Sequence, residues 1–515
     1  MEYLVVGPLV AFVFLLLIIW FWLLNRHKPP STIWPFVGVL PSMIANATQI
    51  HDYASHVLQR TRRHTVRVRI RGLSVNFLLT SDPENIHHIL SANFANYGRG
   101  ERQKETLEFL GEGLLMADGA QWKALRRVTS SLFRTKDFLR LVERTTREKV
   151  ETGLFEVLDH GMRGGLEVDM QDLCLRLTFD VSCIFLLGVD FKSLSPELPR
   201  VPFSEALDDL EESAIRRKIY PRSFWRLQRW LGLGHERKVA IATKILDDFM
   251  YKQVALMRIR STKLKAERHP EGPRGLDVTS IFLLDQEDGT TKRDLDGPKV
   301  PDKYVRDIVM NLMSAGRDAA GTALTWFFWV ISTNPSVESK LVEEMKDALE
   351  MTEGDAWRFP SFHELNKLTY LHAVLNETMR LYPPAPLNIK TAVEPDILPS
   401  GHRVSGDGEV VFSVYAMGRM EEIWGADCLE FRPERWLAES GGITRVPSSK
   451  YISAFSAGPR TCVGKDVAFI MMKMAAAGVV WSYRLRMVRG HHVVSPANSI
   501  VLHIKGGLKV NVTKR

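Results

Sequence analysis

The sequence predicts a mainly helical protein, in which one large helical domain carries a small β subdomain and follows a single membrane-spanning helix. The longest helical pattern runs over Pro301–Ser332 and stops at Asn334-Pro335. At about 1.5 Å per residue this helix would cross a whole domain. Short β-type stretches occur at Arg67–Thr80 and Glu409–Val414. A long uncharged run at the N-terminus is the third observation.

That uncharged run extends from Tyr3 to Leu24 and is long enough to cross a bilayer as a helix. It is longer than the apolar core of a cleaved signal peptide. Tryptophans near its end suit a membrane interface, and the cations Arg26 and Lys28 suit the cytosolic side. We therefore expect a single-pass anchor over residues 1–28, with the N-terminus outside and a globular body over residues 29–515 in the cytosol.

Further helices are expected at Trp122–Arg134, Leu166–Gly188 and Leu368–Leu381. Ser499–Val512 alternates as a β-hairpin would, with Gly506-Gly507 as its turn. The charged segment Ser261–Pro298 is broken by glycine and proline and is expected to be a surface connection. Neither a linker nor an internal repeat divides the body.

The formal net charge is +8 and the pI about 9.2, but the basic residues carry no nucleic-acid signature. We therefore expect no nucleic-acid partner and interpret the charge as a solvated face near a membrane. Four cysteines in 515 residues are too few for a disulfide scaffold, and none forms C-x-x-C. Zinc binding and c-type haem attachment are therefore not expected.

The strongest chemical signal is the pattern F-x-x-G-x-R-x-C-x-G, formed by Phe455, Gly458, Arg460, Cys462 and Gly464. Glycines allow a loop backbone to approach a sulfur and a flat cofactor closely. Backbone N–H groups aimed at the sulfur would stabilise a thiolate, and the arginine can reach a carboxylate at the cofactor's edge. The alternative, an inert buried cysteine, is the usual fate of a free cysteine. Five fixed positions match by chance on the order of once in 10⁴ chains of this length.

Two weaker patterns accompany this loop. Glu377 and Arg380 form E-x-x-R and share a helix face. Trp122 and Arg126, four residues apart, also share a face. Alone, each pattern is most simply a surface ion pair or an amphipathic helix.

Together these motifs resemble the cytochrome P-450 superfamily of haem-thiolate monooxygenases, and the resemblance covers the whole body. It implies haem b with Cys462 as the axial thiolate and metal ligand, which favours O–O cleavage. It implies that Arg460, Trp122 and Arg126 hold the propionates, within a cofactor-binding set that also includes Phe455 and Gly464. It further implies a buried structural triad of Glu377, Arg380 and Arg435, the last in the segment P-E-R-W.

One part of the long helix departs from the family pattern A-G-x-(D/E)-T. Ala315, Gly316 and Asp318 match, but Ala319 stands where a hydroxyl residue is expected. The small residues would open an oxygen groove, with Asp318 as the acid of a proton relay. Thr322 one turn further on, Ser314 one turn back, or a substrate hydroxyl are the candidates for holding a relay water.

Several segments, among them Leu175–Asp180 and Ala457–Asp466, resemble one plant branch of fatty-acid ω-hydroxylases and mid-chain alkane hydroxylases. The expected activity is hydroxylation of a long-chain fatty acid, alkane or wax lipid. No G-x-G-x-x-G opens a strand–helix unit, so electrons should come from a separate NADPH–cytochrome P-450 reductase at the endoplasmic reticulum membrane. Substrate contacts are expected near Asn93–Leu115, Pro384–Ile389 and Ser495–Ile500.

Three alternatives stay open. The same plant branch contains phenol-coupling enzymes of alkaloid synthesis. A reductase-independent isomerase or dehydratase acting on hydroperoxides would suit the missing threonine at Ala319. Outside the enzymes of this fold, a non-catalytic haem-binding protein would show thiolate ligation without turnover.

Overall fold

The computed structural model of the chain describes residues 42, 45–46, 49–70, 75–266, 301–352, 354–439, 442–444, 451, 454–488, 494–497 and 499–515. The anchor predicted at 1–28 lies outside these residues. Within the described part of the chain, no helix has the length and apolar character needed to span a bilayer.

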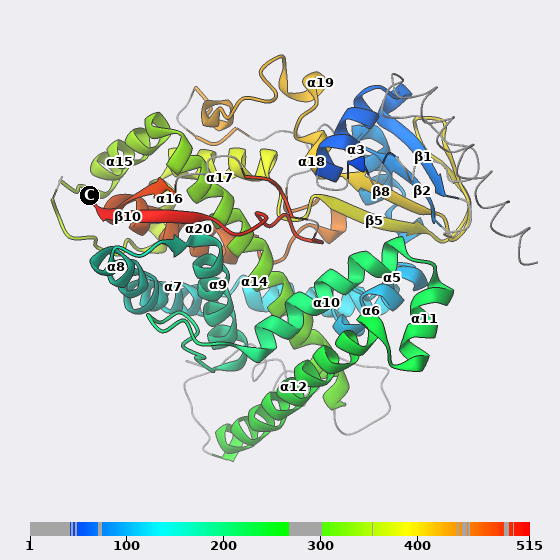
Figure 1. Cartoon of the computed structure of the whole chain (residues 1–515), viewed down its shortest axis with the longest axis horizontal. Helices are drawn as coiled ribbons and strands as arrows, with labels where there is room; N and C mark the ends of the chain where they lie inside the picture. The colour runs from blue at the N-terminus through cyan, green and yellow to red at the C-terminus, as the bar shows by residue number, and fades with distance from the viewer. Residues whose placement is uncertain are drawn as a thin grey trace, which may run out of the picture.

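Helices form most of the described body (Figure 1). The α-helices are α3 Ile50–Gln59, α4 Pro83–His87, α5 Glu101–Thr106, α6 Gly119–Phe133, α7 Lys136–Lys149, α8 Phe155–Gly164, α9 Met170–Leu187, α10 Pro202–Ile219, α11 Arg222–Leu231, α12 Gly234–Ala266, α14 Asp302–Thr333, α15 Pro335–Leu349, α16 Phe362–Lys367, α17 Thr369–Leu381, α18 Val414–Met417, α19 Glu421–Trp424 and α20 Lys465–Ser482. Short 3₁₀ or π turns are η2 Arg62–His64, η3 His88–Ala92, η4 Phe94–Asn96, η5 Glu108–Leu110, η6 Val150–Leu154, η7 Pro433–Trp436 and η8 Gly458–Arg460.

The strands within the described residues form three small sheets. The five-stranded sheet has the order β1-β2-β8-β5-β3, in which only β2 and β8 run parallel. It lies at one end of the molecule beside α3 (Figure 1). The other two sheets have the orders β4-β10-β9 and β6-β7. Strand bounds are β1 Thr65–Ile70, β2 Val75–Thr80, β3 Tyr97–Gly98, β4 Val168–Asp169, β5 Leu387–Ala392, β6 Asp396–Ile397, β7 Arg403–Val404, β8 Glu409–Ser413, β9 Tyr483–Met487 and β10 Lys509–Lys514.

Helix α14 runs through the middle of the helical domain and packs along α9 (Figure 1). Two glycines permit this close approach. A Cβ atom on Gly316 would lie 2.7 Å from the Ser182 hydroxyl, and one on Gly321 would lie 2.9 Å from a methyl group of Leu175. The Thr178 hydroxyl of α9 also donates a hydrogen bond to the Arg317 carbonyl of α14 at 2.7 Å. The close packing fixes the position of α14 in the core. It therefore also fixes which side of α14 faces away from α9.

The helices predicted at Trp122–Arg134, Leu166–Gly188, Pro301–Ser332 and Leu368–Leu381 are confirmed as α6, α9, α14 and α17. Helix α9 begins later than predicted because Val168 and Asp169 form strand β4. The strands predicted within Arg67–Thr80 and at Glu409–Val414 are confirmed as β1, β2 and β8.

The predicted C-terminal hairpin is wrong, and the predicted surface connection begins later than expected. Ser499–Val512 does not fold as a hairpin, because β10 pairs with β9, which ends before residue 499, and with β4, which is distant in sequence. Gly506 and Gly507 do form a turn, with φ values of +82° and +81°, but it leads into β10 from residues outside any named strand. The surface connection predicted at Ser261–Pro298 starts later than expected, since α12 continues to Ala266; residues 267–300 lie outside the described residues.

Candidate active site

The described chain encloses a cavity between the middle of α14 on one side and the loop before α20 on the other. Residues of α6 and the segments around 99, 114–115 and 384–385 complete its walls. All six residues of the predicted cofactor-binding set line this cavity: Trp122, Arg126, Phe455, Arg460, Cys462 and Gly464. The described residues of Ser495–Ile500 do not contribute to this lining.

The Cys462 side chain opens into the cavity, whereas Cys174, Cys183 and Cys428 are buried in the protein. The loop around Cys462 closes on itself, since the Cys462 N–H donates to the Phe455 carbonyl at 2.8 Å. Gly458 has φ +66°, and a Cβ there would lie 2.0 Å from the Leu90 carbonyl oxygen, so this position requires glycine.

Cys462 also stands three residues before Lys465, the first residue of the 18-residue helix α20, and the positive end of a helix favours an anion. Burial raises the pKa of the Cys462 thiol above its ordinary value; a hydrogen bond from the Gly464 backbone and the charges of Arg126 and Lys465 act in the opposite direction. A metal cation bound at the sulfur would favour the thiolate further.

One edge of the cavity gathers basic side chains around Asp118. The Arg460 guanidinium donates to an Asp118 oxygen and to the Ala117 carbonyl, each at 2.7 Å, and lies over the Trp122 ring at 4.7 Å. The backbone N–H of Arg99 donates to the other Asp118 oxygen at 3.0 Å. The Nε atoms of Arg99 and Arg460 are buried without a hydrogen-bond partner among the described residues. This edge is therefore a cationic cradle with donors left for an anion.

Arg99 lines this cradle and Lys390 lies close enough for its charge to interact with Arg99 and Arg460, but neither was predicted from the sequence. Burial lowers the pKa of Arg99 to about 10, with a further contribution from the Arg460 charge. Burial, together with the Arg99 and Arg460 charges, lowers the pKa of Lys390 to about 6. No local motif marks either residue; Lys390 sits on β5, and only the pairing of β5 with β3 brings it beside the Tyr97 carbonyl, 3.4 Å from its ammonium nitrogen.

The cavity wall opposite the Cys462 loop is a stripe of small residues on α14. Ala315, Gly316 and Ala319 line it, together with Ala320 and Ala323. Ala319 stands on the lining itself, so the methyl group that replaces the expected hydroxyl faces the cavity.

The structure does not place Asp318 or Thr322 on this lining, although both lie on α14. Thr322 is fully buried, and its hydroxyl has no hydrogen-bond partner among the described residues. Ser314 is absent from the lining as well. The hypothesis that the Thr322 or Ser314 hydroxyl holds a water in the groove therefore lacks the geometry it requires.

Asp318 instead joins a buried charge cluster beside α10. Arg317 contacts Asp318 at 2.9 Å and Asp208 of α10 at 2.7 Å. Burial and the Asp318 charge raise the pKa of Glu211, another residue of α10, well above its ordinary value. The cluster of Arg317, Asp318, Asp208 and Glu211 therefore lies behind the α14 wall and does not line the cavity.

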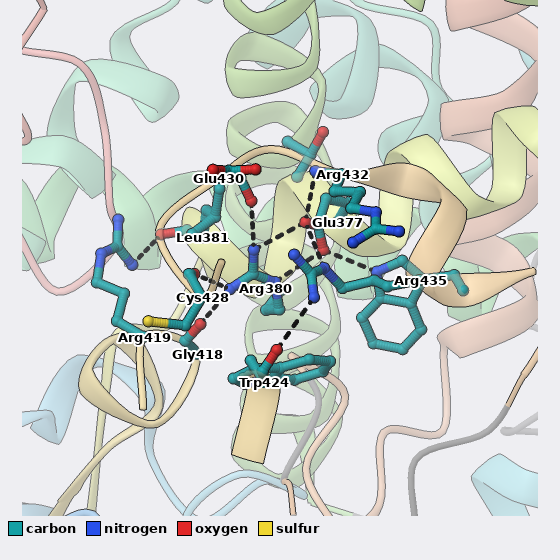
Figure 2. A network of polar contacts seen from close by, with 12 residues as sticks. Glu377, Arg380, Leu381, Gly418, Arg419, Trp424, Cys428, Glu430, Arg432 and Arg435 are labelled. Carbon is teal, nitrogen blue, oxygen red and sulfur yellow. Dashed lines mark hydrogen bonds and ion pairs between the residues drawn. The ribbon is translucent and has the colours of Figure 1, made fainter. Parts of the chain in front are cut away.

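Figure 2 shows the ion-pair cluster in which Glu377, Arg380 and Arg435 meet. Both Glu377 oxygens accept from the Arg380 guanidinium at 2.7 Å, and one also accepts from Arg435 at 3.0 Å. Arg380 donates further to the Cys428 carbonyl at 2.6 Å and the Glu430 carbonyl at 2.9 Å. Glu377 and Arg380 are fully buried. The cluster joins α17 to the segment 418–436 and does not line the cavity.

A thiol facing one side of a cavity, small residues facing the other and a cationic cradle at the edge match the needs of haem. The Cys462 sulfur would ligate the iron, the space between the walls would hold the flat ring, and the unused donors of the cradle would bind the two propionates. The geometry thus defines a haem-thiolate protein.

The chain belongs to the cytochrome P450 family, whose profile matches residues 28–510. It is 38% identical to the alkane hydroxylase MAH1 of Arabidopsis thaliana over 99% of both chains. It is 36% identical to noroxomaritidine synthase 2 of Narcissus pseudonarcissus over 94% of this chain and 91% of the relative. It is also 36% identical to cytochrome P450 86B1 of Arabidopsis thaliana, over 94% and 85% of the two chains. The protein is therefore a haem-dependent monooxygenase of this family.

Proposed function

We propose that this enzyme hydroxylates a long-chain aliphatic substrate, such as a fatty acid, alkane or wax lipid. The observation that carries the proposal is the apolar character of the cavity beyond the cationic cradle. Leu114, Leu115, Phe185 and Leu312 line it together with the alanine stripe of α14. Such a lining favours a methylene chain and offers few partners to a polar substrate. The alkane hydroxylase among the relatives agrees with this substrate class.

In this proposal the Cys462 thiolate would ligate the iron of haem b. The side chains that would hold its propionates are Arg460, Trp122, Arg126 and Arg99. Phe455 and Gly464 give the loop and the start of α20 the shape that lets the ring approach the sulfur. A thiolate-bound haem iron supplies the activation of dioxygen. Ala315, Gly316 and Ala319 leave room for dioxygen.

We also propose that residues 1–28 anchor the enzyme in the endoplasmic reticulum membrane, with residues 29–515 as its cytosolic catalytic domain. The uncharged run Tyr3–Leu24 supports the anchor. Monooxygenases of this family take electrons from reductases, and we propose the NADPH–cytochrome P450 reductase of the same membrane as the partner. A bilayer would also concentrate a lipophilic substrate near the enzyme.

The test is to reconstitute the full chain with a plant reductase and NADPH in lipid vesicles. Octadecane, stearic acid, a phenolic amine and a fatty-acid hydroperoxide are offered in parallel, the hydroperoxide also without reductase, and products are identified by mass spectrometry. Alcohols of the first two support the proposal. Coupled phenols as the only product, conversion of a fatty-acid hydroperoxide without reductase, or haem binding without any turnover would each replace it with one of the alternatives.

The ligand assignment has its own test in the carbon monoxide difference spectrum of the reduced protein. The wild type should show the red-shifted Soret band of thiolate ligation, and Cys462→Ser should lose it. Cys428→Ser is the matched control, because Cys428 is buried outside the cavity. A Cys462→Ser protein that keeps the band would refute the assignment.

A further inference from the structure

The segment Phe109–Ala117 passes over α14 and carries Leu114 and Leu115 to the cavity. Three consecutive turns of α14 face the segment and the adjoining part of the cavity. Asp307 and Asn311 contact the segment, and Ala315, one turn further along the same helix, lines the cavity. One helix thus both holds the segment and carries the alanine stripe.

Asp307 and Asn311 hold the segment through its backbone. The Glu112 N–H donates to Asp307 Oδ2 at 3.0 Å, and the Leu115 N–H donates to Asn311 Oδ1 at 2.8 Å. Asn311 Nδ2 donates to the Leu110 carbonyl at 2.6 Å and to the Asp307 carbonyl at 2.7 Å. Asp307 is 2% exposed and Asn311 is fully buried, so water does not compete for these bonds.

The close fit at this contact depends on two glycines of the segment. A Cβ on Gly111, which has φ +61°, would lie 2.2 Å from the Asp307 carboxyl carbon. A Cβ on Gly113 would lie 2.4 Å from Asn311 Nδ2. Both positions exclude a side chain, so the backbone lies directly against the two polar groups. The far end of the segment is held too, because the Ala117 carbonyl accepts from Arg460 in the cradle.

Asn311 lines the cavity, yet both hydrogens of its amide and its oxygen are engaged with backbone groups. It therefore offers its hydrogen-bonding capacity to the segment and not to a substrate. Asn311 therefore acts on a substrate only indirectly, because it fixes the distance of Leu114 and Leu115 from α14.

Resting on the proposed function, we propose that Asp307 and Asn311 are positioning residues that decide which carbon of an aliphatic substrate is hydroxylated. They hold the leucine wall at one distance from the alanine stripe. A methylene chain between these two surfaces then has a restricted set of positions, and a displacement of about 1 Å is enough to change which of its carbons is near the reacting site.

The test compares Asn311→Leu and Asp307→Leu with the more conservative Asp307→Asn. Leucine has the shape of asparagine without its polar atoms, whereas Asp307→Asn keeps an acceptor for the Glu112 N–H. The matched control is Thr325→Val, which removes a buried hydrogen bond from the Thr325 hydroxyl to the Gly321 carbonyl on the same helix, away from the segment. Each holoenzyme is first checked for its thiolate-type carbon monoxide band.

Two readouts follow. Hydrogen exchange at the amides of residues 112 and 115 should accelerate by roughly tenfold in the leucine variants. The ratio of hydroxylation positions on stearic acid and octadecane should shift by about threefold or more. Asp307→Asn and Thr325→Val should retain the wild-type ratio.

Leucine variants with a wild-type product ratio would overturn the inference, whether or not exchange accelerates. A ratio shifted equally by Thr325→Val would also overturn it, because the effect would then be one of general stability. A wild-type enzyme that converts neither probe would refute the proposed function instead. Unchanged exchange in the leucine variants would by itself show that the two residues do not hold the segment.

Discussion

Replacing Glu377 by glutamine should destabilise the fold more than the loss of any exposed ion pair. The two Glu377 oxygens receive donors from Arg380, Arg435 and the backbone N–H of Arg432, and from the Trp436 indole at 2.9 Å. Glutamine removes the charge that the guanidinium groups of Arg380 and Arg435 share. It also replaces one acceptor oxygen with an amide donor that faces other donors. Breaking a buried pair from one side costs about 3–5 kcal/mol. Whole domains are stable by only about 5–15 kcal/mol.

The assay is urea unfolding of the purified protein, followed by circular dichroism and by the fraction that retains the thiolate-type carbon monoxide band. Glu434→Gln is the matched control, since Glu434 precedes Arg435 directly but pairs with Lys340 at 2.7 Å on an exposed surface. An exposed pair contributes about 0–1 kcal/mol. Equal losses of unfolding free energy in Glu377→Gln and Glu434→Gln would refute the view that the buried cluster holds this part of the core together.

Three further predictions concern the cavity. Burial among cations lowers the pKa of Lys390 from 10.5 to about 6, so between these pH values the unfolded chain binds one more proton than the folded chain. The free energy of unfolding of haem-depleted protein should therefore rise with pH across this window. Lys390→Met should reduce this dependence on pH. Equal urea midpoints of the wild-type protein at the two ends of the pH window would contradict the prediction. Gly458→Ala drives a methyl group into the Leu90 carbonyl and should abolish the thiolate-type band, so a normal band would show that the loop can relax. Ala319→Thr should raise the amount of hydroxylated product formed per NADPH consumed, whereas Thr322→Ala should leave this ratio unchanged. The reverse pattern would support Thr322 as the relay residue.

Features encoded by neighbouring residues could be predicted from the sequence. The long pattern ending at Asn334-Pro335 identified α14, and the spacing of Gly458, Arg460 and Cys462 identified the loop below the cavity. The triad residue Arg435 was predictable only through the family resemblance, because it is 58 positions away from Glu377.

What the sequence did not reveal depends on contacts between distant segments. Lys390 lies near the cradle because β5 pairs with β3, and β10 pairs with the distant β4 as well as with β9 rather than with the residues just before it. A pattern of alternating residues predicts a strand but not its partner. Thr322 illustrates the same limit, since its spacing from Ala319 suggested a place in the groove and only the packing of α14 buries it away from the cavity.

The most direct test of the proposed activity is reductase-dependent turnover of octadecane and stearic acid under isotopically labelled dioxygen, with products analysed by mass spectrometry. Monooxygenation predicts an alcohol that carries one labelled oxygen atom, formed only when NADPH and reductase are both present. An unlabelled product, a product formed without reductase, or no product from either substrate would contradict the account.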